Sequence, residues 1–249
     1  MIKEKTEEIN IDKTQIEKMF EVGAHYAYTK TKRHPSTKPF IFGAKNNTEI
    51  FDLEKTFVSL EEAKKFVLSL FDKAGTQILF VASKNESKHI VKDIAEGIDM
   101  PLVFNRWVGG TLTNFEMTKK RVDRFLKLTD EKEKGELMKY TKKERLQIDK
   151  EIAKLDKKFA GISSMKTLPA AIFIVDPRYE SVAVKEAQSK NIPIIALANS
   201  DCNVKEIDYP IMANDSAGES VNFFTEEIAS VCKNKPVVKE ETPKSKILN

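Results

Sequence analysis

The chain has 249 residues, of which 41% are hydrophobic and 32% charged, enough for one sizeable domain with an appendage or for two small domains. No apolar run reaches the roughly 18 residues that a membrane-spanning helix needs, and the mixed acidic and basic start is unlike a secretory or transit peptide, so the cytoplasm is the expected compartment. The net charge of +4 is too small to identify a nucleic-acid-binding protein by itself. The distribution of charge along the chain is therefore the observation that tests for such binding.

Several secondary-structure elements are expected in chain order. Residues 39–42 and 49–51 flank a turn with Asn46 and Asn47, which predicts a β-hairpin. Residues 54–73 then have the apolar spacing of a helix. Beyond them, β-branched and aromatic runs alternate with helical segments, which predicts an α/β layered domain with a parallel sheet covered on both faces. The expected strands are residues 77–83, 101–105, 170–176, 193–199 and 209–213, and the further helices are 86–96, 179–190 and 216–231.

A different kind of segment separates the second and third core strands. Residues 115–159 are rich in lysine and glutamate and lack proline, and apolar side chains recur there at helical spacing. We therefore expect an inserted, protruding antiparallel helical hairpin, a coiled coil that reverses near residues 130–135. Its expected stripes are Val122, Phe125 and Leu126 on one helix and Ile148, Ile152, Leu155 and Phe159 on the other. The expected domains are an α/β domain at residues 1–114 and 160–232, the hairpin at 115–159, and a flexible lysine-rich tail at 233–249.

The α/β pattern raises the possibility of an enzyme, but phosphate-binding signatures are missing. Neither a Gly-x-Gly-x-x-Gly turn nor a Gly-x-x-x-x-Gly-Lys loop occurs, so we expect no nucleotide cofactor. Asp176 and Asp201 fall at strand ends, where open α/β sheets bind ligands, but such aspartates more often cap helices or form turns. The histidines are not at metal-ligand spacing, and the two cysteines lack a secretory context, so neither a metal site nor a disulfide is expected.

Positive charge is concentrated in two parts of the chain. Residues 25–45 carry five cations and no carboxylate, and residues 116–158 carry 15 basic and 10 acidic side chains, so the remainder is acidic. In the first part, Tyr26, Tyr28 and His34 interleave with the cations, a combination that suits unpaired bases and phosphates, although a solvated loop is the alternative. The candidate phosphate contacts there are Lys30, Lys32, Arg33 and Lys38.

A second candidate segment is residues 105–114, NRWVGGTLTN. Its adjacent glycines permit a tight backbone, Arg106 is able to fork onto phosphate, and Thr113 or Asn114 is placed to cap the following helix. A cationic cluster in the first turns of that helix opposes the helix dipole, a cost that a bound anion would offset. A structural elbow and a solvated helix face are the alternatives. The cluster consists of Lys119, Lys120 and Arg121.

The segment NRWVGGTLTNF closely resembles the Arg-Trp-x-Gly-Gly-x-Leu-Thr-Asn element of the bacterial ribosomal protein S-two family. The resemblance also covers FEVGAHYAYTKTKRHPSTKPFIFGAKN and IFDLEKT near the start, IFIVDPRYESVAVKEAQSKNIPIIALANSDCN in the middle, and IDYPIMANDSAGESV later. These motifs span most of residues 19–231 in the family's order. Several collinear motifs are far more specific than one.

The resemblance implies a flavodoxin-like three-layer α/β domain with a protruding helical hairpin, and an architectural component of the small ribosomal subunit that supports translation. It implies binding to small-subunit ribosomal RNA near the junction of head and body, and neighbouring small-subunit proteins that include S-one. It implies no enzymatic activity, cofactor, small-molecule substrate or membrane. Carried over by position, the RNA-facing candidates in or beside family motifs are Lys30, Arg33, Lys38, Arg106, Trp107, Asn114 and Arg178.

The first basic loop departs from the family. The family usually has Gly-His-x-x-x-Arg-Trp-Asn-Pro there, whereas this chain has Ala27-Tyr28-Thr29-Lys30 and then Lys32-Arg33-His34-Pro35. Some members are associated with zinc. The changed loop leaves no convincing set of ligands, so no metal is expected here.

Two alternatives to the ribosomal hypothesis stay open. One is an enzyme of the same layered fold that acts on a phosphorylated metabolite at the strand ends, and the other is an adaptor that uses the hairpin as a coiled-coil docking arm. Binding to RNA separates the ribosomal hypothesis from both, and its affinity should fall steeply with salt. Arg33 and Lys38 are expected to be exposed, so replacing both by glutamate is predicted to weaken RNA binding without unfolding the protein.

Overall fold

The computed structural model describes residues 13–71 and 75–233 of the chain. At its centre is a five-stranded sheet in which every pairing is parallel and the strand order is β5-β4-β6-β7-β8. Numbered along the chain this is the 2-1-3-4-5 order of flavodoxin-like sheets. All five predicted core strands are confirmed, as β4 (Ile78–Val81), β5 (Leu102–Val103), β6 (Ala171–Val175), β7 (Ile194–Ala198) and β8 (Tyr209–Met212).

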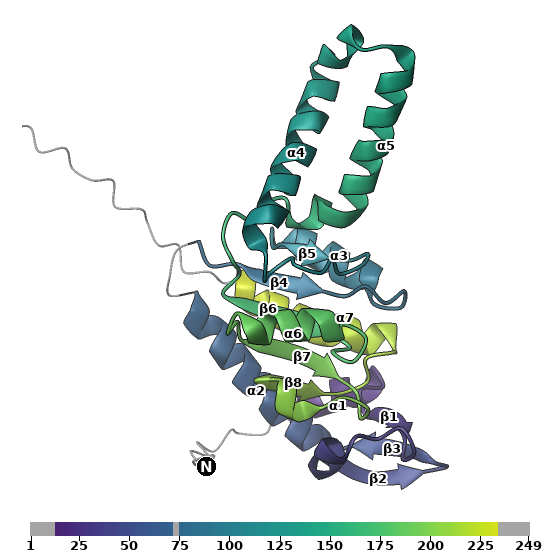
Figure 1. Cartoon of the computed structure of the whole chain (residues 1–249). Helices are drawn as coiled ribbons and strands as arrows, with labels where there is room; N and C mark the ends of the chain where they lie inside the picture. Colours follow the sequence, from purple (N-terminus) through teal and green to yellow (C-terminus); the bar gives the residue numbers. More distant parts are fainter. Residues whose placement is uncertain (1–12, 72–74, 234–249) are drawn as a thin grey trace, which may run out of the picture.

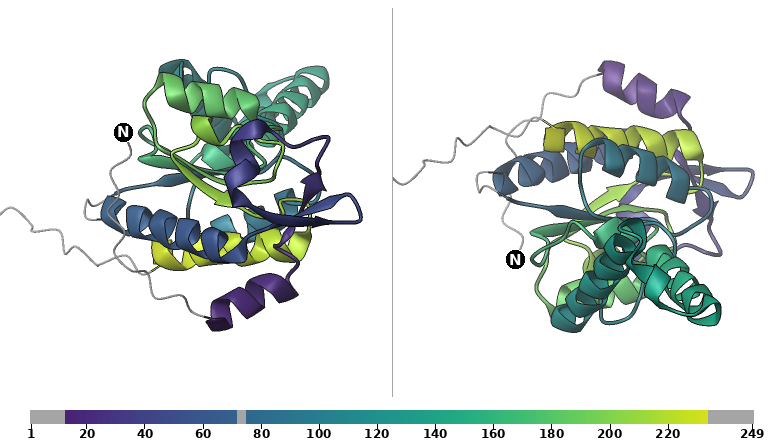
Figure 2. Two further views of the ribbon diagram at one scale, coloured as in Figure 1. Left: turned by 90° about the horizontal axis from the view of Figure 1, so that it is seen from below. Right: turned by 90° about the horizontal axis from the view of Figure 1, so that it is seen from above.

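Helices cover both faces of this sheet (Figure 1). α2 (Leu53–Leu70), α3 (Lys88–Gly97) and α7 (Gly218–Lys233) lie on one face, and α6 (Ser181–Ser189) lies on the other (Figure 2). Successive strand residues alternate between two cores, so that Phe80 packs on the α2 side and Leu79 on the α6 side. Because β4, β6 and β7 are buried on both faces, their sequences are apolar throughout.

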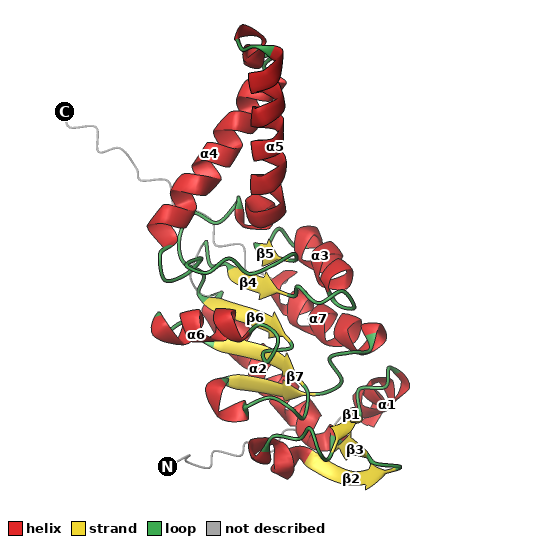
Figure 3. Cartoon of the chain, turned by 45° about the vertical axis from the view of Figure 1, so that its right-hand side comes forward, coloured by secondary structure: helices red, strands yellow, loops and turns green. Residues whose placement is uncertain are grey.

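The residues before α2 form a smaller sheet at one end of the central sheet (Figure 3). β2 (Ile41–Lys45) and β3 (Thr48–Phe51) pair antiparallel around Asn46 and Asn47, whose φ angles are +50° and +65°, so the predicted hairpin is confirmed. β1 (Tyr26–Thr29) adds to β3 as a third strand, and α1 (Lys13–Glu21) precedes it. Neither β1 nor α1 was predicted from the sequence.

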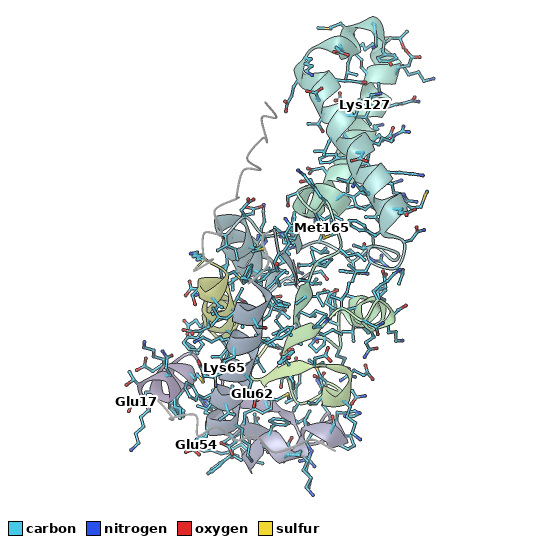
Figure 4. The ribbon with its side chains drawn as sticks, turned by 90° about the vertical axis from the view of Figure 1, so that its left-hand side faces the viewer. Glu17, Glu54, Glu62, Lys65, Lys127 and Met165 are labelled. Atoms are coloured by element: carbon cyan, nitrogen blue, oxygen red, sulfur yellow. The ribbon has the colours of Figure 1, made fainter. Side chains whose placement is uncertain are left out.

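Between β5 and β6 the chain forms α4 (Phe115–Glu133), the turn η2 (Glu136–Lys139) and α5 (Lys142–Phe159). The two helices lie side by side and project away from the sheet (Figure 1), and in Figure 4 Lys127 on α4 lies far from Glu54 on α2. Gly135, with a φ of +74°, ends α4 and allows the reversal. Val122 and Phe125 are buried as expected from their stripe, whereas Leu126 is exposed.

The foot of α5 requires a second special residue. η3 (Ala160–Ile162) follows α5, and a Cβ atom on Gly161 would overlap the carbonyl oxygen of Leu102 in β5. Only glycine therefore allows this turn to pack on β5.

None of the helices in the described residues is long and apolar enough to span a membrane. The predicted lysine-rich tail, residues 233–249, lies outside the described residues except for Lys233, which ends α7.

Candidate nucleic-acid interface

The first basic segment is anchored to the end of β7. His34 is the N-cap of η1 (Pro35–Phe40), where its Nδ1 accepts a hydrogen bond from the N–H of Ser36 at 3.3 Å. The N–H of His34 and the hydroxyl of Thr37 both donate to the carbonyl oxygen of Ser200, at 2.8 and 3.0 Å. The loop is therefore held in place while three of its predicted cations remain exposed to solvent. These are Lys30, Lys32 and Lys38.

Arg33 is not one of the exposed cations. Its Nη1 lies 2.6 Å from Oε1 of Glu49, and the two side chains are 21% and 2% exposed. Residues 25–45 contain no acid, but β3 brings Glu49 back beside them. The prediction that Arg33 is exposed is therefore wrong. Arg33→Glu would set a carboxylate against buried Glu49 and destabilise the fold, so the double substitution with Lys38 does not isolate RNA binding.

Two of the three aromatic residues expected to meet bases are used inside the fold. The hydroxyl of Tyr28 lies 2.9 Å from Oγ of Ser216, and His34 caps η1. Tyr26 alone among the three is exposed.

The loop before α4 is wrapped around one buried carboxylate, that of Glu186 on α6. Oε1 of Glu186 accepts hydrogen bonds from Nε1 of Trp107 at 3.0 Å and from the N–H of Gly110 at 2.7 Å. Oε2 accepts from the N–H groups of Leu112 and Thr113, at 2.9 and 3.1 Å. Trp107 is 7% exposed and packs in the core under α6. The structure thus turns Trp107 inward, contrary to the prediction that it faces RNA.

Glu186 is a structural residue that the sequence analysis missed. Burial alone would raise its pKa, but the hydrogen bonds from Trp107 and the backbone outweigh burial and hold the pKa of Glu186 below its ordinary value. The carboxylate therefore stays charged. The sequence did contain a signal for this role, because Glu186 lies on the same helix face as the buried residues Ala183 and Ala187. A glutamate is rarely buried without hydrogen-bond partners, so this position indicates that other groups bind its carboxylate.

The remaining candidates near this loop are exposed at the start of α4. Asn114 is the N-cap residue, but its side chain makes no capping hydrogen bond, and the Thr113 hydroxyl bonds to Glu186, so the predicted side-chain cap is absent. Nζ of Lys119 donates to the carbonyl oxygen of Lys166 at 3.4 Å. The other exposed candidates are Arg106, Lys120 and Arg121.

Cations at the foot and at the tip of α4 and α5 have different surroundings. Near the tip, Lys132 pairs with Asp149 at 2.7 Å. At the foot, Lys157 and Lys158 in the last turn of α5 line a small cavity with Arg106 and Asp156, and none of the three cations forms an ion pair within the described part of the chain. This lysine pair was not predicted as a site, although the sequence places two adjacent cations at the end of the expected second helix. We call Arg106, Lys119, Lys120, Arg121, Lys157 and Lys158 the foot surface.

Arg178, which follows β6, lies near the first basic loop. It lines a cavity of about 210 Å³ together with His34. Its Nη1 lies 2.7 Å from Oδ2 of Asp201, and this hydrogen bond raises the pKa of Arg178. The side chain is otherwise exposed, so its remaining N–H groups can meet a second anion. We call Lys30, Lys32, Lys38 and Arg178 the loop surface.

The carboxyl ends of β4 and β6, where sheets of this order bind ligands, are bridged by protein side chains. Nζ of Lys84 lies 3.1 Å from Oδ2 of Asp176 and 3.3 Å from Oγ of Ser216. Asp215 lies buried beside them and accepts a hydrogen bond from Asn199 at 2.8 Å. Burial, together with the charge of Asp176, raises the pKa of Asp215 to about 6. An internal ion pair thus closes the switch point, which argues against an enzyme that binds a phosphorylated metabolite there.

Within residues 13–71 and 75–233, no group of three or more His, Cys, Asp and Glu side chains is arranged to hold a metal ion. Cys202 and Cys232 are both buried and are not joined by a disulfide.

Comparison with known proteins gives a consistent result. The profile of the family described as Ribosomal protein S2 matches residues 19–234. A protein named small ribosomal subunit protein uS2 from Roseiflexus castenholzii is 41% identical over 85% of this chain and 80% of its own length. Proteins of the same name from Spiroplasma citri and Dehalococcoides mccartyi are 39% and 35% identical, over 92% and 87% of this chain and 64% and 88% of their own lengths. The chain therefore belongs to the ribosomal protein S2 family.

Proposed function

We propose that this chain holds ribosomal RNA in the small ribosomal subunit through the loop surface and the foot surface. The S2 family is a family of structural, non-enzymatic proteins of the small subunit, and the relatives carry that name. The observation that carries the RNA assignment is the foot surface, where no cation has an ion-pair partner among the described residues, although Arg124 and Lys132 farther along α4 pair with carboxylates of α5. Clustered cations without carboxylate partners are suited to phosphates.

The arrangement of the chain gives the two surfaces separate tasks. We infer an α/β body of residues 1–114 and 160–232, and an arm of residues 115–159 formed as an inserted coiled coil. The foot surface lies where the two meet, with Arg106 on the body and its five lysine and arginine partners on the arm. Phosphate contacts set the position and orientation of a protein on RNA without reading its sequence. Two such surfaces on one body, one beside β7 and one at the foot of the arm, would fix its orientation between two RNA segments, such as those at the junction of head and body.

The tip of the arm favours a protein contact in addition. Met138 and Leu146 are both exposed there, and exposed apolar side chains are typical of protein interfaces. Neighbouring small-subunit proteins, including S-one, are therefore the expected protein partners. The exposed apolar residues at the tip also support a second function for the same molecule, in which the arm docks onto another protein.

Sedimentation of the tagged chain with ribosomal particles tests the main proposal. The protein should comigrate with the small subunit and stay bound after a moderate-salt wash, since several phosphate contacts act together. Protein that remains at the top of the gradient in growing cells would contradict it.

A triple alanine variant of the foot surface tests the RNA contacts directly. Lys120→Ala with Arg121→Ala and Lys157→Ala should weaken binding to small-subunit ribosomal RNA, and the slope of log affinity against log salt should fall by about one for each phosphate contact removed. The matched control removes three cations near the tip, with Lys132→Ala, Lys134→Ala and Lys139→Ala. Equal losses in both variants would mean that net charge, and not the foot surface, determines binding.

A further inference from the structure

The open face of the small sheet carries a hollow that neither cationic surface includes. Its volume of about 580 Å³ falls within the range of small-molecule pockets, roughly 300–1,000 Å³. Tyr26 of β1, Phe42 of β2 and Ile50 of β3 line it, and Tyr26 and Ile50 face each other across the strands. The alternate residues Ala27 and Glu49 are buried on the opposite side. One face of this sheet is thus covered by the protein and the other is open.

Aromatic rings dominate the open face. The ring of Phe20 stacks on that of His25 with centroids 4.4 Å apart and an interplanar angle of 12°, and the ring of His25 lies 4.0 Å from that of Tyr26. The outer rings of this column are 60% and 53% exposed, and Phe42 is 80% exposed. A planar partner buries the most apolar area of an exposed aromatic ring and also stacks on its face. The hollow is therefore suited to a flat ligand.

Polar groups in the hollow point to the kind of flat ligand. Nδ1 of His25 is buried and has no hydrogen-bond partner within the described chain. Burial lowers the pKa of His25, so this ring, which lies between those of Phe20 and Tyr26, is neutral near pH 7. Lys45 and Asn46 stand at the rim, and none of the lining residues is acidic. A planar ring attached to an anion suits the exposed aromatic rings and the cationic lining.

We propose that this hollow binds one unpaired RNA nucleobase, stacked on the ring of Phe42, the most exposed ring of the hollow, with Lys45 against the adjoining phosphate. The proposal rests on the RNA-binding function proposed above and adds an unpaired base to its phosphate contacts. Open sheet faces that carry aromatic side chains hold single-stranded bases in the same physical way, because every base presents a π face once it is unstacked. An apolar segment of a neighbouring protein is the competing occupant, and the cation and the lack of acids in the lining favour the base.

Two fluorescent single-stranded RNA probes of about ten nucleotides, within the length that such sites cover, test the proposal with the full-length chain. One probe carries bases throughout, and the other has abasic sugars in its central half but the same number of phosphates. The wild type should bind the first probe about tenfold more tightly than the second, as expected for one stacked base. In parallel, binding to small-subunit ribosomal RNA is measured as a function of salt, which tests the proposed function independently.

Substitutions at Phe42 separate stacking from simple apolar contact. Phe42→Ala and Phe42→Leu should both abolish the tenfold preference, because leucine restores apolar area without a π face, and Phe42→Tyr should retain it. Phe42 is largely exposed, so these changes leave the core intact, and thermal unfolding checks this. Tyr140→Ala, which removes an exposed ring near the tip of the arm, is the matched control and should keep the preference.

The outcomes are distinguishable. A wild type that binds both probes equally, yet still binds ribosomal RNA with a steep salt dependence, overturns this inference and leaves the proposed function standing. A preference that survives in Phe42→Leu overturns the stacking argument. If Phe42→Ala keeps the preference but washes off small subunits more easily, the hollow holds a neighbouring protein instead. Failure to bind ribosomal RNA at all overturns the proposed function, and this inference with it.

Discussion

The α/β body and the projecting arm use charged side chains in opposite ways. In the body, Glu186, Glu49 and Asp215 are buried, and each is bonded to a loop or strand that is distant in sequence. On the arm, ion pairs such as that of Arg124 with Glu151 lie on the surface. A buried carboxylate fixes where its partners lie, whereas an exposed pair contributes little to stability. The body therefore sets its geometry with buried carboxylates, whereas the ion pairs of the arm remain on its surface.

The largest effect that this contrast implies is at Glu186. Glu186→Ala should lower the free energy of unfolding by about 4 kcal/mol, because it leaves Nε1 of Trp107 and the N–H of Leu112 buried without an acceptor and also removes the acceptor of two part-buried backbone N–H groups. Urea denaturation measures the change. Glu62→Ala, which removes an exposed glutamate of α2 seen in Figure 4, is the control. Equal losses of unfolding free energy in the two variants would show that Glu186 does not hold this loop in place.

A second, smaller effect concerns the dependence of stability on pH. Because the pKa of Asp215 rises from 3.8 to about 6 on folding, the folded protein holds this proton more tightly than the unfolded chain. Its contribution to stability is therefore fully present below about pH 4 and is lost as pH rises to about 6, a difference of at most about 3 kcal/mol.

Asp215→Asn isolates this effect. The free energy of unfolding of the wild type minus that of the variant should fall between pH 4 and 6 and stay level above this window, and urea titrations across the range measure it. A difference that does not change with pH would show that Asp215 titrates normally.

The smallest expected effect lies on the arm. Lys132→Ala breaks the exposed pair with Asp149 and should cost about 0.5 kcal/mol, with the loss shrinking further at high salt. Thermal unfolding at two ionic strengths measures it. A loss above about 2 kcal/mol would contradict the contrast, because it would mean that the arm too is held together by its charges.

The contrast also explains what the sequence alone was able to predict. The core strands are continuous apolar runs and were found. The lysines of the loop surface are exposed, with no ion pair recorded among residues 13–71 and 75–233, and their contact with RNA stays a prediction. Arg33 and Trp107 were misassigned because their carboxylate partners come from elsewhere, Glu49 from β3 and Glu186 from a helix 79 positions away. The short strand β1 was missed for a similar reason, since it is defined by its pairing with β3.

The carboxylate of Glu186 has a further consequence for the way the foot surface meets RNA. Fixing the backbone of one residue costs about 1–2 kcal/mol of conformational entropy, and the loop that carries Arg106 loses this entropy when the protein folds. Under the proposed function, association with RNA would require no ordering of that loop, and the foot would dock as a rigid body. The rate of encounter is consequently governed by diffusion and by the attraction between cations and phosphates, and not by a wait for the loop to reach the binding conformation.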